Sequence, residues 1–210
     1  MDAVKLVAPL LCACTITSIE EPSSSTEGAP TSSITIDVLA ASGDGTRANA
    51  TADLNVDGLH AKLGKGDAFR LVDGLGDVTA FVEDNGLYDA TLATSDTALA
   101  IQFVRDGAVA LTKAIPLPPP FSPIATSSSR ASGIALSWQA APAFPMVIVA
   151  TGSPCLPADG FRAHLEPDTG AFEIQPADLI TAPGPCTISV AFTRGLQQTQ
   201  TRTVTVPTTP

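Results

Sequence analysis

The stretch "DLNVDG", residues 53–58, can be interpreted in two ways that lead to different folds. As the start of an EF-hand calcium loop, it supplies side-chain oxygens at the first three ligand positions, followed by the required glycine. That loop also needs a bidentate Glu at its last position, where this chain has Gly64, and an amphipathic helix on each side. As a strand, it places Leu54 and Val56 on the inner face, and its closing Asp-Gly pair makes a turn. The strand interpretation fits better and predicts β-structure.

Apolar and polar residues alternate on both sides of this stretch. "ITIDVLA" (34–40) places Ile34, Ile36 and Val38 on one face, which is typical of a half-buried strand. No segment keeps the 3.6-residue period of an amphipathic helix. Further alternating runs, separated by turn sequences such as "SGDG", "EDNG" and "RDG", lie at residues 48–56, 68–72, 78–82, 88–93, 99–104 and 108–114. This spacing predicts an all-β sandwich or barrel.

A proline-rich stretch, "IPLPPPFSP" (115–123), interrupts the alternation. Such a sequence favours an extended, semi-rigid spacer. Alternation then resumes in "IALSW", "MVIVAT", "FRAHL", "AFEI", "CTISVAF" and "TRTVTV". We therefore predict a first β-sandwich domain over residues 34–114, a linker over 115–123 and a second sandwich over 124–206.

Two short motifs resemble those of known sandwich families. "DNGLYDA" (84–90) resembles the tyrosine corner of immunoglobulin-like domains, which implies that the Tyr88 hydroxyl bonds back to the main chain. "IALSW" (134–138) is similar to the Trp-bearing strand of fibronectin type III domains, with Trp138 as a core anchor. The resemblance implies two small immunoglobulin-like β-sandwich domains in tandem.

The N-terminus carries an apolar run, Leu6 to Ala13, that is too short to span a membrane, since a spanning helix needs about 20 residues. It suits the apolar part of an export signal. The run ends in "LCAC" (11–14), which resembles the lipobox of bacterial lipoproteins. The resemblance implies a signal peptide over residues 1–13 and an acyl chain on Cys14. Plain secretion, or an apolar N-terminus that is neither, remains an alternative.

The next segment is made mostly of Ser, Thr, Glu, Gly and Pro and lacks the apolar residues needed for a core. We expect a flexible polar tether over residues 14–33. Thr15 follows Cys14 where an Asp would signal retention in the inner membrane, which points to the outer membrane. The layout as a whole resembles predicted bacterial lipoproteins of unknown function, and that resemblance implies no activity.

The charge balance limits the partners. The chain has 21 acidic and 11 basic residues, a formal net charge of −10, and no run of basic residues. Nucleic acids and anionic lipid surfaces require Lys and Arg to neutralise phosphates, so we expect no nucleic-acid binding. The expected partners are the membrane, through the lipid anchor alone, and an unidentified extracellular protein or glycan.

The two remaining cysteines, Cys155 and Cys186, lie far from the N-terminus and are too widely spaced for a zinc knuckle. In an exported protein they would form one disulfide. The alternative is a pair of reactive thiols, but nothing near them in the sequence would lower a thiol pKa.

Signs of catalysis are absent from the sequence. Only His60 and His164 could act as the histidine base that activates a nucleophile. The sequence has no G-x-S-x-G, H-E-x-x-H or Walker A motif. We expect no enzyme, no cofactor and no metal site, although acidic turns could converge on calcium. Those turn residues are Asp44, Asp67, Asp73, Asp77, Glu83, Asp84 and Asp89.

The sequence therefore favours a non-catalytic envelope lipoprotein, a structural or interaction module at the cell surface. The alternative is a module that binds an extracellular glycan or protein, with or without calcium. Exposed aromatic side chains would favour that alternative, and Phe121, Phe144 and Phe161 are the candidates.

Overall fold

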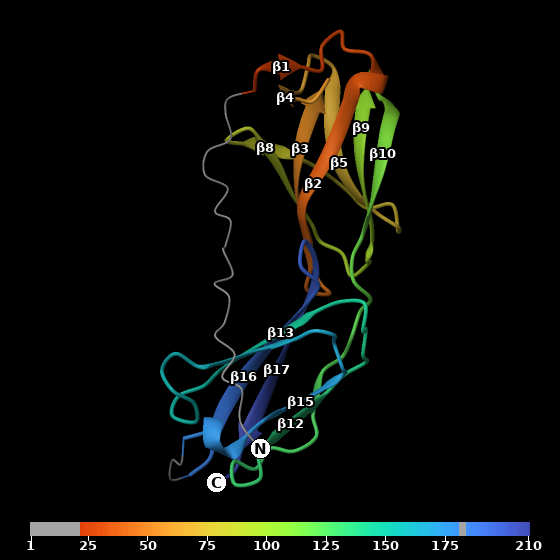
Figure 1. Ribbon diagram of the computed structural model, residues 1–210. Helices are drawn as coiled ribbons and strands as arrows, with labels where there is room; N and C mark the ends of the chain where they lie inside the picture. Colours follow the sequence, from red (N-terminus) through yellow and green to blue (C-terminus); the bar gives the residue numbers. More distant parts are fainter. Residues whose placement is uncertain (1–21, 181–183) are drawn as a thin grey trace.

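The computed structural model describes residues 22–180 and 184–210 of the chain and contains strands, turns and two short 3-10 segments. The described residues form two lobes arranged end to end (Figure 1). We call residues 22–117 the N-terminal lobe and residues 118–210 the C-terminal lobe. Within the described residues, no helix is long and apolar enough to cross a membrane. The predicted all-β class is confirmed.

The N-terminal lobe packs two open sheets face to face. One sheet has the order β1-β4-β3-β2, with β8 and β7 continuing beyond β3, and the other has the order β10-β9-β5-β6. The strands are β1 (Ser24–Ser25), β2 (Ile34–Gly43), β3 (Ala48–Val56), β4 (Leu59–Lys62), β5 (Asp67–Asp73), β6 (Val78–Ala80), β7 (Val82–Asp84), β8 (Leu87–Leu92), β9 (Ala98–Arg105) and β10 (Ala108–Pro116).

The "DLNVDG" stretch ends β3, and the strand interpretation is confirmed. β3 pairs antiparallel with β2, and Leu54 and Val56 lie in the core between the sheets. Asp57 and Gly58 both have positive φ angles, 51° and 79°, as a tight hairpin turn requires. They turn the chain into β4, which pairs with the end of β3.

The C-terminal lobe is built in the same way from shorter strands. Its strands are β11 (Ile124–Ala125), β12 (Ile134–Ser137), β13 (Met146–Thr151), β14 (Phe161–Leu165), β15 (Ala171–Ile174), β16 (Cys186–Arg194) and β17 (Gln198–Thr208). β17-β16-β13-β14 form one sheet and β11-β12-β15 the other. The two enclose a separate core that includes Trp138 and Phe192, whose rings lie 5.2 Å apart edge to face.

The structure confirms the expected roles of Tyr88 and Trp138 in the two motifs. Tyr88 is buried in β8, and its hydroxyl accepts a hydrogen bond of 3.0 Å from the main-chain N–H of Leu63. Trp138 directly follows β12 and is buried, as a core anchor should be.

One sheet runs from lobe to lobe. At its C-terminal end β2 pairs in parallel with the start of β17, with Gln198 opposite Ala41 and Gln200 opposite Gly43. The sheets of the two lobes are thereby joined into one ten-stranded sheet. In Figure 1, β17 continues downward from the level at which β2 ends.

The predicted tether is too long. Residues 22–33 belong to the N-terminal lobe, since β1 pairs in parallel with β4 and residues Thr31–Ser33 form a 3-10 turn. The polar composition misled the prediction because these residues are held by hydrogen bonds to a buried Asp and an Arg rather than by apolar burial. The part of the predicted tether before residue 22, together with Cys14, lies outside the described residues.

Candidate functional site

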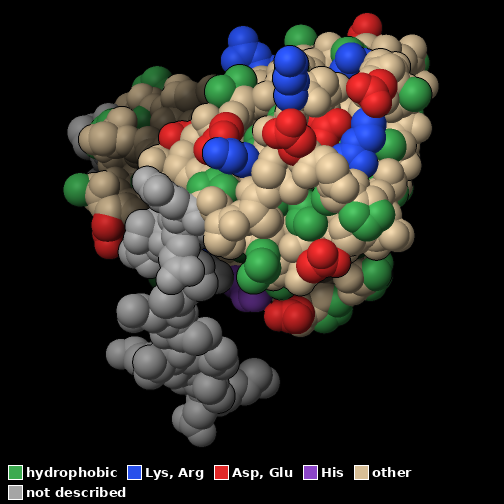
Figure 2. Space-filling view, turned by 90° about the horizontal axis from the view of Figure 1, so that it is seen from above, with side chains coloured by type: hydrophobic (Ala, Val, Ile, Leu, Met, Phe, Trp, Pro, Cys, Tyr) green, Lys and Arg blue, Asp and Glu red, His purple; other side chains and the backbone are tan. Residues whose placement is uncertain are grey.

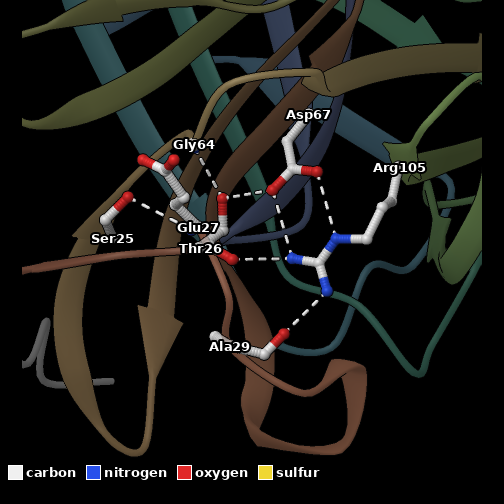
Figure 3. A network of polar contacts seen from close by, with 7 residues as sticks. All are labelled: Ser25, Thr26, Glu27, Ala29, Gly64, Asp67 and Arg105. Carbon is white, nitrogen blue, oxygen red and sulfur yellow. Dashed lines mark hydrogen bonds and ion pairs between the residues drawn. The ribbon is translucent and has the colours of Figure 1, made fainter.

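The most extensive polar network of the N-terminal lobe holds the segment that contains Thr26 and Ala29 (Figure 3). This segment follows β1, which lies at the upper end of the lobe in Figure 1. The Arg105 guanidinium, at the end of β9, donates to the main-chain oxygens of Ala29 and Thr26, both at 2.7 Å. The same group binds both carboxylate oxygens of Asp67 at 3.1 Å. The Thr26 hydroxyl donates to Asp67 at 2.6 Å and accepts from the N–H of Gly64 at 2.7 Å. We call this network the N-terminal clamp.

The electrostatics of the clamp favour its charged form. Burial alone would raise the pKa of Asp67, but hydrogen bonds from Arg105 and Thr26 and the Arg105 charge outweigh burial and lower that pKa. The hydrogen bond to Asp67 in turn raises the pKa of Arg105. Thr26 itself is completely buried. The clamp is therefore a satisfied, charge-assisted network that orders a segment without an apolar core of its own.

A second candidate site is the joint between the lobes. Besides the β2–β17 register, the N–H of Ala41 donates to the carbonyl of Gln197 at 2.9 Å. Gly43 fits closely between the lobes, because a Cβ there would lie 3.1 Å from both Gln200 Nε2 and Leu117 Cδ1. At Gly45, whose φ is +87°, an added Cβ would lie 3.0 Å from the Arg202 guanidinium. The joint is thus formed by main chain in close approach, where glycine leaves room.

The proline-rich linker is packed against both lobes. Leu117 is buried in the core of the N-terminal lobe, and Phe121 in that of the C-terminal lobe. Pro118 between them is buried, and an added Cβ at Gly195, in the β16–β17 turn, would lie 2.8 Å from its Cγ. The predicted linker is therefore packed against both lobes, and few of its residues remain to act as an extended spacer.

A buried ion pair supports the joint from the side of the C-terminal lobe. Arg194 and Asp168 have side-chain exposures of 1% and 0%, with Arg194 Nε and Nη2 each 2.9 Å from Asp168 Oδ2. Arg194 Nη1 donates to the carbonyl of Pro119 in the linker at 2.8 Å, and Nη2 donates to the carbonyl of Gln139. The guanidinium lies 4.3 Å from the centre of the Phe121 ring.

The remaining oxygen of this carboxylate is also satisfied. Trp138 Nε1 donates to Asp168 Oδ1 at 2.7 Å, and the N–H of Gly170 donates to it at 2.9 Å. One fully buried carboxylate therefore ties together the linker-binding Arg194 and the central Trp138. A buried charge pair is tolerated only when its hydrogen-bonding groups are satisfied in this way.

The predicted disulfide between Cys155 and Cys186 is present. It joins the loop after β13 to the start of β16 at the end of the lobe away from the joint. Arg130 is buried beside it, with Nη1 3.1 Å from Cys186 Sγ, and Thr208 Oγ1 lies 3.1 Å from each sulfur.

The two histidines differ in their surroundings. His60 is largely buried in β4, with Nδ1 2.5 Å from Asp53 Oδ1, and its Nε2 faces Gly86 and has no hydrogen-bond partner among the described residues. His164 is exposed on β14. The structure thus places a carboxylate beside His60, and Gly86 occupies the side from which a nucleophile would approach.

The acidic turn residues bind their own turns. Asp44 accepts hydrogen bonds from the main-chain N–H groups of Thr46 and Arg47, and those from Thr46 contribute most to lowering its pKa. Asp73 accepts from the Thr94 hydroxyl, which lowers its pKa most, and from the N–H groups of Leu75 and Asp77. In the described ranges, no three His, Cys, Asp or Glu side chains lie close enough to hold a metal ion.

The aromatic candidates are not exposed platforms. Phe121 is buried, Phe144 is partly buried, and Phe161 is partly buried with its ring 5.7 Å from that of Phe172. These positions give no support to the expected alternative of a ligand-binding aromatic surface.

The sequence patterns did not identify the charged residues of the clamp and the joint. For Arg194 a signal existed, because it continues the inward positions of β16 set by Ile188, Val190 and Phe192. Arg105 and Asp168 had no such signal, since their partners lie on segments distant in sequence.

Comparisons with known proteins assign no family to this chain. No family model matches the chain, and no curated protein matches it. Similar solved structures include a tetra-tandem repeat from the extending region of a large adhesion protein, with 16% identity and a TM-score of 0.32. Others are the FN1–FN3 domains of chicken CNTN1 (12%, 0.31) and native Escherichia coli alpha-2-macroglobulin (13%, 0.31).

The matched regions cover 83%, 83% and 87% of this chain, respectively. They cover 48% of the adhesion-protein chain, 64% of the CNTN1 chain and 14% of the macroglobulin chain. No residue role, activity or partner passes from these proteins to this chain.

Proposed function

We propose that this chain is an envelope lipoprotein whose two β-sandwich lobes form a non-catalytic structural module at the cell surface. Cys14 carries the acyl anchor, and the outer membrane is the proposed location. The two sandwich domains meet at the packed linker of residues 117–121. The module holds whatever binds its outer end at a fixed distance from the membrane.

The observation that carries this proposal is the position of the clamp. Residues 22–33 are fixed to the end of the N-terminal lobe opposite the joint, and the C-terminal lobe lies beyond the joint (Figure 1). Eight positions separate Cys14 from Pro22, so an extended chain between them reaches at most about 29 Å. An anchor on Cys14 therefore keeps the clamp end near the membrane and the C-terminal lobe away from it.

The length of the module follows from the two joined strands. β2 has 10 residues, β17 has 11, and three pairs overlap. At about 3.3 Å per residue, the two strands together span about 60 Å. This distance suits a spacer that presents its outer lobe above a membrane.

The surface of the clamp end agrees with a position beside lipid headgroups without binding them. Seen from above in Figure 2, acidic and basic side chains lie side by side and do not separate by sign. Such a mixed surface has no basic patch to bind anionic headgroups. The lipid on Cys14 would then supply the membrane affinity.

The test is the N-terminal mass of the mature protein purified from membranes. We expect a diacyl or triacyl mass on Cys14 in the wild type and its loss in Cys14→Ser. Cys12→Ser is the matched control, because it removes a thiol two positions away and should keep the acyl mass. An unmodified N-terminus in the soluble fraction would overturn the proposal.

A further inference from the structure

We infer that the overlap of β2 and β17 is a mechanical splice, through which tension passes from the membrane anchor to the outer lobe. The overlap pairs Ala41, Ser42 and Gly43 with Gln198, Thr199 and Gln200. The inference rests on the proposed function for the direction of the load, but the geometry of the splice is independent of it.

The two strands run in the same direction along the molecule. β2 begins at Ile34 near the clamp and ends at the joint, and β17 begins at the joint and ends at Thr208 near the far end (Figure 1). Tension from the anchor passes first through residues 22–33, which the clamp holds, and then enters β2 at its first residue. Tension from the outer end enters β17 at its last residue. The two strands are pulled apart along their own axes.

This direction of pulling loads the pairing in shear. In a parallel ladder the hydrogen bonds bridge the two strands at regular intervals, so sliding one strand past the other stretches all of them together. Pulling at right angles would break them one after another. A short overlap therefore resists axial tension better than its three residue pairs suggest.

Side chains from both lobes prevent the splice from bending open. Gln200 is buried in the overlap, and Leu117 and Gln200 both come close to Gly43. Arg202 lies over the turn that contains Gly45. The linker adds a covalent connection, with Pro119 held by Arg194.

The experiment is to pull the full chain in optical tweezers, with one handle on Cys14 and the other on a tag after Pro210. Cys12→Ser leaves Cys14 as the single free thiol, because Cys155 and Cys186 are joined. The protein for this measurement is produced without lipidation, so the Cys14 thiol is free to take the handle. A missing acyl mass on Cys14 would refute the proposed function, whereas the pulling result tests the splice alone. Failure of one proposal can therefore be told apart from failure of the other.

Ala41→Pro is the variant that weakens the splice. It removes the N–H that donates to Gln197, and in an extended strand that N–H points away from β3, so the β2–β3 ladder is kept. Ala158→Pro is the matched control, because Ala158 is exposed and lies in the turn closed by the Gly160 N–H to Pro157 bond, where proline is favoured.

We expect the wild type and Ala158→Pro to lengthen only when the clamp releases residues 22–33 or when a lobe unfolds. Ala41→Pro should gain an earlier, lower-force transition as the joint opens, with the later unfolding steps of both lobes retained. A cross-linked Ala41→Cys/Gln198→Cys variant should show no joint opening at any force. Identical traces for the wild type and Ala41→Pro would overturn the inference. If Ala41→Pro lacks the lobe unfolding steps, the wild type is compared with the cross-linked variant instead. An early, low-force transition in the wild type that the cross-link removes would equally overturn the inference.

Discussion

Replacing Asp168 with Asn tests the buried ion pair beside the joint. Asn keeps an oxygen that can accept from Trp138 and from the N–H of Gly170, but it places an NH₂ group where Arg194 needs an acceptor. Both partners are at least 99% buried, so the Arg194 charge would be left without its counter-charge away from water. Removing one partner of such a pair costs about 3–5 kcal/mol.

The assay is urea unfolding of the disulfide-intact protein, followed by tryptophan fluorescence. Trp138 is the only tryptophan and contacts Asp168 directly, so the signal reports on the C-terminal lobe. With an m value of about 2 kcal/mol/M, the midpoint should fall by about 2 M. The exposed Asp159→Asn serves as the control and should stay within about 0.5 kcal/mol of the wild type. A loss below about 1 kcal/mol for Asp168→Asn would refute the assignment of the ion pair.

Three further outcomes follow from the structure. Because the pKa of Asp67 is lowered in the folded protein, ionised Asp67 stabilises the clamp above pH 3.8, the ordinary value, and this contribution is lost as the pH falls through the folded-state pKa. Amide exchange of residues 24–33 should therefore rise on acidification. Asp67→Asn should remove this pH dependence. Reducing the disulfide, whose cysteines are 31 positions apart, should cost ~3.7 kcal/mol by the loop-entropy relation, as measured by urea unfolding with and without reductant. Gly195→Ala should lower the melting temperature in calorimetry, because φ is +94° and the added Cβ would clash with the main-chain carbonyl of Gln198. Gly107→Ala is the control that separates backbone strain from this clash, since Gly107 has a positive φ but open space around it.

The strands could be predicted from the sequence because their signal is local. In β3 and β16 the inward residues alternate with outward ones, so the buried face can be identified without knowing its partner. Tyr88 and Trp138 were predictable for a related reason, since a large side chain among strand residues needs a core.

The clamp and the joint could not be predicted, because each depends on residues that meet only in the folded chain. Residues 22–33 look like a solvated tether until Arg105 and Asp67 are placed beside them. The linker did contain a usable signal, because Leu117 and Phe121 are apolar side chains among prolines, and both are buried. Alternation says which residues of a strand face inward but not which distant strand lies beside it.

The pairing of Ala41 with Gln198 also means that the sheet joining the two lobes cannot form until β17 has been synthesised. A chain made from its N-terminus presents β2 early, whereas β17 emerges more than 150 residues later. Until then the end of β2 is an open strand edge, available to any other extended segment. Contacts between distant parts of a chain form slowly, so this edge is where a second chain could pair during synthesis. Gln198, Thr199 and Gln200 therefore protect the end of β2 once they have paired with it.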